Sequence, residues 1–278
     1  MDGTFDVAPP LFTQVYSIHA DYLGRSHPLV YGILTNKRRA TYRPFLNELS
    51  NIANHAFQPL AIITDFEMAA IQAVGDVFPN ASKTGCFFHL TQNIHKRIQG
   101  AGLQGMYEGD ANFALQCRMI SALSFVPPAD VADAFETLSG EVADELTPIM
   151  DYFEDNYIGR PDRRGFRRAP LFGIDLWNQY NRVLQGHNRT TNSVEAWHRA
   201  IKSLLGISHP TIFKFIKGLA RCQKLRDAEL EQLLAGHPPR QRKTVYVMRD
   251  RRMRTIVTDY ANRPTMDYLR GLAHNIRH

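Results

Sequence analysis

The stretch that most constrains the fold is a short apolar run that ends in an acidic residue. Residues 60–63 are apolar, Thr64 follows, and Asp65 closes the run. Residues 68–74 then carry apolar side chains at helical spacing. A short apolar run ahead of a helix is typical of a buried strand in an α/β sheet. Because open α/β sheets place their sites at the carboxyl ends of strands, Asp65 is either a site residue or only the N-cap of the helix.

The first hundred residues alternate between strand and helix patterns. The sequence predicts a β-prone start, strands over 12–20 and 27–35, a helix over 41–55, the apolar strand with its helix, a strand over 83–89 and a helix over 90–99. Three strands followed by alternating helices and strands favour a mixed sheet with helices on its faces. The predicted fold class is therefore α/β.

After Gly100 the pattern becomes helical, and no strand is predicted. Helices are expected over 111–125, 128–138, 141–157, 193–205, 211–234 and 265–277, with an aromatic, partly helical segment over 172–184. The aromatic side chains Trp177 and Tyr180 are expected to pack in a core, with stacking on an unpaired base as the alternative.

Composition excludes several classes of protein. No apolar run approaches the ~20 residues that a membrane span requires, and no signal-peptide pattern is present. The three cysteines are widely spaced, which favours a reducing compartment over a disulfide scaffold. The net charge of +6 is mildly basic, and the basic residues gather in two segments, 160–168 and 240–254. Each Lys or Arg that meets a phosphate adds salt-dependent affinity for nucleic acid, and a solvated basic loop is the alternative.

Three acidic residues stand apart from the rest: Asp2 in the early strand, Asp65, and Glu195 in a helix far downstream. Adjacent carboxylates repel each other unless a cation lies between them, and oxygen ligands suit Mg²⁺. Glu195 has a structural alternative as well. Asn192 could cap the helix with Glu195 three residues later, or Glu195 could pair with Arg199 one turn on.

Four motifs together resemble a known family. They are Asp2-Gly-Thr-Phe, Ile63-Thr-Asp65-Phe-Glu67, Gly85-Cys86-Phe-Phe-His89 and Asn192-Ser-Val-Glu195-Ala-Trp-His198. In this order and spacing they are similar to the MULE (Mutator-like element) transposase domain, one of the DDE transposases. The resemblance implies an RNase H-like core over 1–99 and 188–236, an all-helical insertion over 100–187, and a basic C-terminal extension over 237–278. It also implies that Asp2, Asp65 and Glu195 are the catalytic, metal-binding carboxylates.

The resemblance implies a function as well. It predicts strand cleavage and strand transfer on DNA, at transposon ends and target, with two Mg²⁺ (or Mn²⁺) ions. It further implies a nuclear location and a homodimer or larger assembly, and the sequence points to no membrane. Two alternatives stay open: a domesticated transposase that binds DNA without cutting it, and an RNase H-like nuclease. Family members carry a full strand before the first Asp, whereas only Met1 precedes Asp2 here, so a fragment of a longer protein is a further expectation.

Further residues complete the prediction. Cys86 and His89 match a family pair, and with His198 they are expected to be accessory to the site. A buried thiol and a hydrogen-bonded imidazole are preferred to a zinc site, because closed structural zinc sites need four ligands. His95, His187 and His198 are the candidate companions. The predicted DNA-binding residues are Arg163, Arg164, Arg167, Arg168, Arg240, Arg242, Lys243, Arg251 and Arg252.

Overall fold

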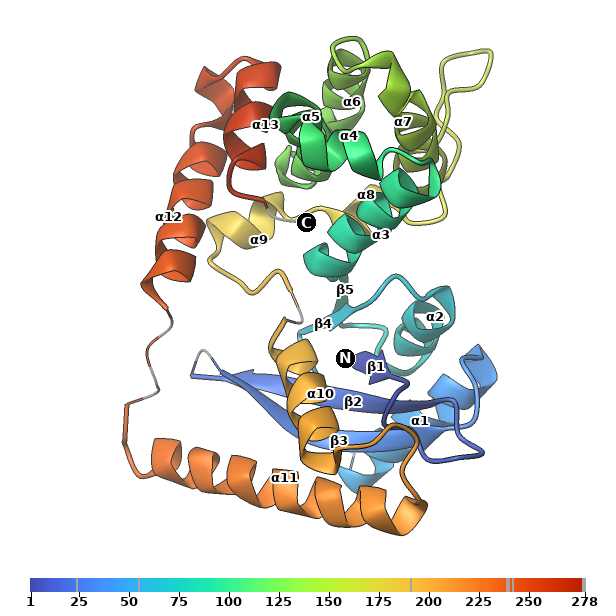
Figure 1. Cartoon of the computed structure of the whole chain (residues 1–278), viewed down its shortest axis with the longest axis vertical. Coiled ribbons are helices and arrows are strands. Elements are labelled where there is room, and N and C mark those ends of the chain that lie inside the picture. The colour runs from blue at the N-terminus through green and yellow to red at the C-terminus, as the bar shows by residue number, and fades with distance from the viewer. Residues whose placement is uncertain (24, 55, 191, 239–240, 242, 277–278) are drawn as a thin grey trace. The chain divides into compact units, whose positions relative to one another are not determined.

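The computed structural model describes residues 1–23, 25–54, 56–190, 192–238, 241 and 243–276 (Figure 1). The chain divides into two compact units. The core unit comprises Met1–Lys83 and Thr190–Gln241, and the helical unit comprises Thr84–Arg189 and Arg242–His278. The boundaries predicted from the family resemblance stay a prediction. Two boundaries between the compact units, after residues 189 and 241, lie close to predicted boundaries, after 187 and 236. The C-terminal segment belongs to the helical unit.

The core unit follows the predicted order of elements. Its elements are β1 (Asp2–Thr4), β2 (Gln14–Tyr22), β3 (Arg25–Leu34), α1 (Arg39–Ile52), β4 (Ala61–Thr64), α2 (Met68–Val77), β5 (Ser82–Gly85, where the first segment ends), α10 (Asn192–Leu205) and α11 (Ile212–Leu234). Strands β1, β2 and β3 form an antiparallel sheet in that order, and β4 pairs with β5. The α/β class is confirmed, but the single mixed sheet is described as two sheets. A hydrogen bond of 2.8 Å from the Met1 amino group to the Ile63 carbonyl links them.

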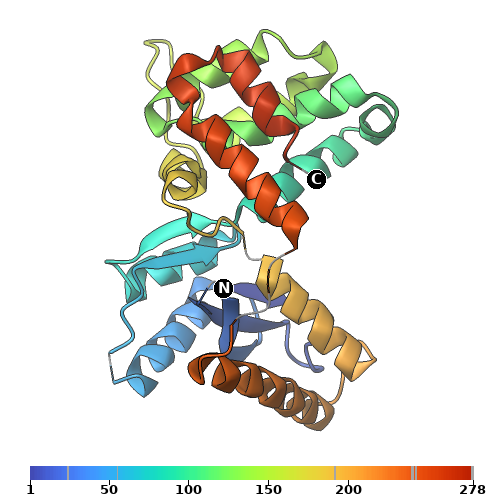
Figure 2. The same cartoon turned by 90° about the vertical axis from the view of Figure 1, so that its left-hand side faces the viewer.

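Strand β2 separates two apolar layers because its side chains alternate between the faces of the sheet. Tyr16 and Ile18 pack with α1, β4 and α2, whereas Val15 packs with α10 and α11. Figures 1 and 2 show α1 on one side of this sheet and α10 with α11 on the other. The helices supply one apolar face each, such as Trp197 and Ile201 on α10, which lie one turn apart. The sheet is therefore covered on both faces.

The helical unit contains no strand apart from the end of β5 among its described residues. Its α-helices are α3 (Phe87–Gly100), α4 (Gln104–Gly109), α5 (Ala111–Ala122), α6 (Val131–Ser139), α7 (Thr147–Phe153), α8 (Ile174–Trp177), α9 (Tyr180–Leu184), α12 (Thr244–Thr258) and α13 (Thr265–Ala273). A π-helical turn, Glu154–Ile158, extends α7. Trp177 is fully buried and donates its indole N–H to the Tyr157 carbonyl at 2.9 Å. The expectation that Trp177 packs in a core is confirmed.

Three details of the prediction were wrong. Strand β5 ends at Gly85 and α3 begins at Phe87, so His89 lies in a helix and not at the end of a strand. Phe87 and Leu90 are buried one turn apart, and this packing overrides the β-propensity of the aromatic run. Helix α10 begins at Asn192 itself, so this residue does not precede the helix as its N-cap. Helix α12 was not predicted, because only two of its side chains, Met253 and Val257, are buried.

Among the described residues, no helix combines the length and the apolar character that crossing a membrane requires.

Candidate metal centre

Asp2 is held at the start of β1 with its side chain on the α10 face of the sheet. It lies directly opposite Ser17 of β2, and residues opposite each other in an antiparallel pair share a face. The Asp2 residue is buried, at 5 % exposure, and its Oδ1 accepts the Gly3 N–H at 2.8 Å. A Cβ on Gly3 would lie 2.2 Å from Oε1 of the buried Gln14, so a larger residue here would force the Gln14 side chain to move. The strand register and the Gly3 N–H therefore hold the first carboxylate in place.

Glu195 lies in the first turn of α10 and is half-buried. One of its carboxylate oxygens and one of the Asp2 carboxylate lie within 4.8 Å of each other. Packing of Trp197 and Ile201 against the sheet fixes this end of the helix beside β1. A divalent cation between two carboxylates this close would balance their negative charges. The donor set of hard oxygen atoms fits Mg²⁺ or Mn²⁺.

Asp65 follows β4 immediately, and it is not the N-cap of α2. The N-cap position belongs to Glu67, so the capping alternative for Asp65 was wrong. Burial raises the pKa of Tyr16 well above its ordinary value, and the nearby charges of Asp65 and Asp2 raise it further. Asp65 and Asp2 therefore both lie near enough to the buried Tyr16 to affect its pKa.

Glu67 is a fourth carboxylate close to this group. Its Oε2 forms an ion pair with Lys37 Nζ at 2.8 Å. Burial, and then a hydrogen bond with Glu67, raise the pKa of Tyr42. The sequence prediction named Glu67 within a motif and gave it no role in the site. The two-residue spacing from Asp65 was the signal that could have linked it to the site.

His198 lies on α10 beside the same carboxylates. Its Nδ1 is 3.8 Å from Asp2 Oδ2, and its Nε2 is 3.1 Å from Ser17 Oγ. His19 approaches the same hydroxyl, with Nε2 at 3.2 Å from Ser17 Oγ. The prediction named His198 as accessory but missed Ser17 and His19. Burial lowers the pKa of His19 to about 3, so this imidazole is neutral at physiological pH.

Cys86 and His89 lie in the helical unit. Cys86 is fully buried just before α3, and His89 lies in the first turn of that helix. In the described part of the helical unit, no three His, Cys, Asp or Glu side chains gather around this pair. His95 instead packs edge-on against Tyr107, with ring centroids 5.0 Å apart. The described residues of this unit do not supply the four ligands of a closed zinc site.

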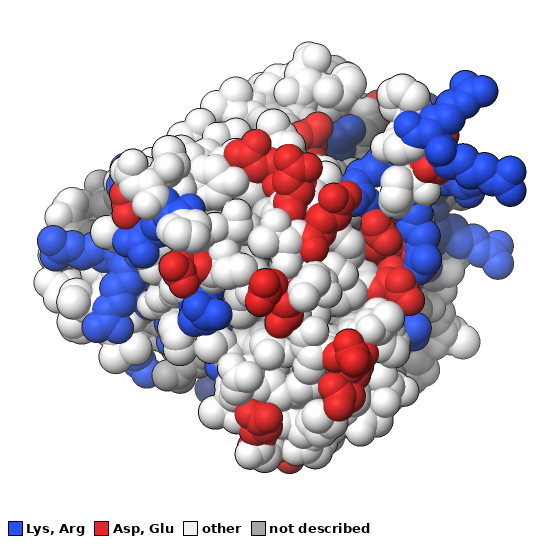
Figure 3. Space-filling model, turned by 90° about the horizontal axis from the view of Figure 1, so that it is seen from above, with Lys and Arg blue, Asp and Glu red and all other residues white. Residues whose placement is uncertain are grey.

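The predicted DNA-binding residues differ in how accessible they are. Most of those described are exposed: Arg163, Arg164 and Arg168 in the loop after α7, and Lys243, Arg251 and Arg252 at and in α12. Arg167 is the exception, since its guanidinium is 2.8 Å from Glu136 and 2.7 Å from Glu154. Arg240 and Arg242 lie outside the described residues. In the view of Figure 3, acidic side chains spread over the middle of the face, and Lys and Arg side chains gather at its edges.

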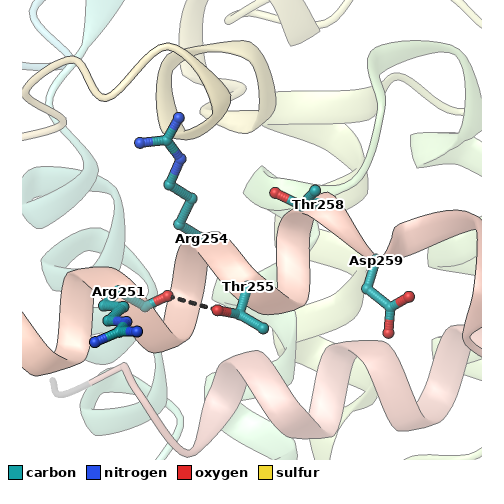
Figure 4. A pocket seen from close by; sticks show the side chains of 5 residues that line it. All are labelled: Arg251, Arg254, Thr255, Thr258 and Asp259. Carbon is teal, nitrogen blue, oxygen red and sulfur yellow. Dashed lines mark hydrogen bonds between the residues drawn. The ribbon is translucent and has the colours of Figure 1, made fainter.

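Helix α12 also lines a surface pocket of about 400 Å³. Its lining residues are Arg251, Arg254, Thr255, Thr258 and Asp259 (Figure 4). Arg254 donates from Nη2 to the Leu184 carbonyl at 3.0 Å, and the Thr255 hydroxyl donates to the Arg251 carbonyl at 3.1 Å. The guanidinium groups of Arg251 and Arg254 offer further hydrogen-bond donors of the kind that phosphate groups accept.

A comparison with known protein families gave a match for the N-terminal third of the chain. Residues 1–93 match the family model of the MULE transposase domain. A comparison with curated proteins and with solved structures gave no significant match. The match confirms the resemblance seen in the sequence, covers Asp2 and Asp65, and ends before Glu195. It indicates a transposase-related function, and with it an interaction with DNA and the use of a divalent metal.

Proposed function

We propose that the chain is a DDE-type transposase that cleaves and joins DNA strands with divalent metal ions. One observation carries the proposal. A carboxylate oxygen of Asp2 and one of Glu195, from the two separate segments of the core unit, lie within 4.8 Å of each other. The family match supports the same assignment for Asp2 from the sequence alone. Two carboxylates brought this close together are the ligands that a divalent cation prefers.

Asp65 is the third carboxylate of the proposed site. We place β4 beside β1 as parallel neighbours of an RNase H-like sheet, which joins the two described sheets. The hydrogen bond from the Met1 amino group to the Ile63 carbonyl supports this placement. In a parallel pair, a residue whose N–H bonds to one carbonyl lies level with the residue after that carbonyl. Met1 would then be level with Thr64 and Asp2 with Asp65, which brings the two carboxylates to the same end of the sheet.

The three carboxylates would hold two Mg²⁺ or Mn²⁺ ions between them. Such ions supply an activated attacking oxygen and stabilisation of the leaving oxygen in phosphoryl transfer. The chain's own contribution is to fix the ligands. The β1–β2 register holds Asp2, the end of β4 holds Asp65, and the packing of α10 holds Glu195. The nucleophile would be water for strand cleavage and a DNA 3′-hydroxyl for strand transfer.

The basic surfaces of the helical unit would bind the DNA backbone. The exposed arginines near 163 and on α12 contact phosphates in this proposal, without reading sequence. A nuclear location and assembly as a dimer or larger complex on paired DNA ends are part of the same proposal.

Titration calorimetry with Mn²⁺ and Mg²⁺ tests the metal site. We expect binding by the wild-type chain, loss of binding in Asp65→Ala, and unchanged binding in Glu48→Ala, an exposed carboxylate on α1. Nicking of a supercoiled plasmid with Mn²⁺ then tests cleavage, and joining of a 3′-hydroxyl end to the plasmid separates a transposase from a simple nuclease. A folded wild-type chain that binds neither ion would contradict the proposal and favour a domesticated DNA-binding protein.

A further inference from the structure

A row of three polar side chains runs beside the proposed metal carboxylates. Ser17 and His19 point to the same face of β2, because they lie two residues apart in a strand. The Ser17 hydroxyl lies between two imidazoles, 3.2 Å from Nε2 of His19 and 3.1 Å from Nε2 of His198. Ser17 itself is fully buried, so solvent does not compete for these contacts. On its other side, His198 turns Nδ1 toward Asp2 Oδ2, at 3.8 Å.

The protonation state of His19 determines which atoms donate in these hydrogen bonds. Burial lowers the pKa of His19 to about 3, so the ring is neutral and carries one N–H. Its Nδ1 is buried and has no hydrogen-bond partner among the described residues, whereas its Nε2 faces the Ser17 hydroxyl. A buried N–H that lacks an acceptor is costly, by about 1–3 kcal/mol. The proton therefore belongs on Nε2, and His19 donates to Ser17 Oγ.

The hydrogen bond from His19 in turn determines how Ser17 bonds to His198. Since its oxygen accepts from His19, its one proton is available to an acceptor. Two acceptors are in reach, His198 Nε2 at 3.1 Å and the Asp2 carbonyl at 3.4 Å. The contact to His198 is the shorter of the two, and on the other side of that ring Nδ1 faces a carboxylate, which accepts hydrogen bonds and does not donate, so we assign the Ser17 proton to His198 Nε2. The His198 proton must then be on Nδ1, the nitrogen that faces the Asp2 carboxylate.

We infer that His19 and Ser17 are positioning residues that fix His198 as the Nδ1–H tautomer, so that it orients the Asp2 carboxylate for a divalent cation. The part of this inference that concerns the cation rests on the proposed function. His198 turns its Nδ1–H toward the Asp2 carboxylate at 3.8 Å, so it acts on this ligand by electrostatic attraction and is not itself a ligand. Partners that orient metal ligands typically change metal affinity by about 10–100-fold when they are removed.

The tautomer can be measured in the metal-free chain by NMR. Histidines labelled with ¹³C and ¹⁵N give different correlation patterns for Nδ1–H and Nε2–H rings, and His198→Gln assigns the signal. We expect Nδ1–H for His198 in the wild type and a shift toward Nε2–H in Ser17→Ala. His19→Phe is a second variant. It keeps a ring against Trp197, whose centroid is 5.5 Å from that of His19, and should shift the tautomer in the same direction. An Nε2–H signal in the wild type, or one that neither variant changes, would overturn the inference.

The orienting role has a separate readout in Mn²⁺ affinity. We expect Ser17→Ala to weaken binding by about 10-fold or more. In a His198→Gln background, the same change should alter affinity by less than about 2-fold, because Ser17 acts only through His198. Ser121→Ala, a buried serine of the helical unit, is the matched control and should bind as the wild type does.

The outcomes distinguish the inference from the proposed function. Equal effects of Ser17→Ala in both backgrounds would indicate a packing role and overturn the orienting role. A wild-type chain that binds no Mn²⁺ would contradict the proposed function together with the orienting role. The tautomer measurement would still test the hydrogen bonds that link His19, Ser17 and His198.

Discussion

The two units differ in one group of acidic side chains. In the helical unit Arg167 bridges Glu136 and Glu154, and Arg189 pairs with Asp250. The core unit contains ion pairs as well, such as Glu67 with Lys37. In the core unit Asp2 lies beside a second carboxylate, that of Glu195. Paired charges stabilise a fold or cost it little, whereas two neighbouring carboxylates oppose it until a cation binds. The comparison distinguishes ion pairs, which stabilise the fold, from neighbouring carboxylates, which are suited to bind a cation.

The interiors also differ, and each unit contains one of the chain's two tryptophans. Trp177 lies among stacked aromatic rings in the helical unit, with Phe153 at a centroid distance of 5.3 Å. Trp197 packs from α10 against the sheet in the core unit, stacked on Tyr31 at 5.0 Å. Single-tryptophan variants, made by Trp→Phe at the other position, therefore report each unit separately.

The largest expected effect is on the aromatic interior of the helical unit. Phe153 is fully buried, so Phe153→Ala should lower the free energy of unfolding of this unit by about 3–5 kcal/mol. Urea unfolding followed by Trp177 fluorescence measures it. The transition reported by Trp197 should stay in place, and Ile201→Ala on α10 should give the reverse result. Equal shifts of both reporters in either variant would contradict separate unfolding of the units.

The next effect is a pH dependence confined to the core unit. Burial lowers the pKa of His19 from 6.5 to about 3, so between these values the unfolded chain takes up a proton that the folded chain refuses. The contribution of the neutral His19 to the free energy of unfolding is fully present above pH 6.5. Below pH 6.5 it decreases as the pH falls, by at most about 1.4 kcal/mol per pH unit. Wild type should therefore lose about 2–3 kcal/mol relative to His19→Gln between pH 7 and 4.5.

The metal-free chain and the Trp197 signal give this measurement, because other titrating groups cancel in the difference between the two proteins. If both proteins lose the same stability on acidification, His19 does not stay neutral in the folded core unit.

Much of the fold could be predicted because local patterns decided it. The apolar run before Asp65 is a strand, and the order of the first eight elements is as expected. The failures have physical causes as well. Helix α12 exposes Val245, Tyr246 and Met248, so it lacks the apolar stripe that signals a helix. The relation of β4 to β1 depends on pairing between distant segments, which periodicity does not encode.

The candidate site was predictable only in part. The resemblance to a family named Asp2, Asp65 and Glu195, since no local pattern connects acids so far apart in sequence. Ser17 and His19 were missed because polar residues that alternate with apolar ones look like the solvent-facing side of a strand. Here α10 covers that side, so the same residues are enclosed and bond to His198. Only the packing of a distant helix distinguishes the two cases.

A smaller effect distinguishes two neighbouring arginines of the helical unit. Arg167 is 19 % exposed and bonds to two glutamates, so Arg167→Met should cost about 1–3 kcal/mol in the transition reported by Trp177. Arg163 is exposed, and Arg163→Met should change stability by less than about 0.5 kcal/mol. For DNA affinity at low salt we expect the reverse order, because only Arg163 is accessible to a phosphate. Equal losses of stability would remove this distinction.

The smallest effect bears most directly on the comparison between the units, because its sign differs between them. With EDTA present, Glu195→Gln should raise the stability of the core unit by about 1 kcal/mol, since it removes one of two repelling charges. Glu136→Gln, which weakens an ion pair of Arg167, should lower the stability of the helical unit by about 0.5 kcal/mol. Saturating Mn²⁺ should reverse the first result, because only the wild-type chain gains stability from the bound ion. If Glu195→Gln is less stable than the wild type even without metal, the acid serves its helix and not a cation, and the difference between the two units disappears.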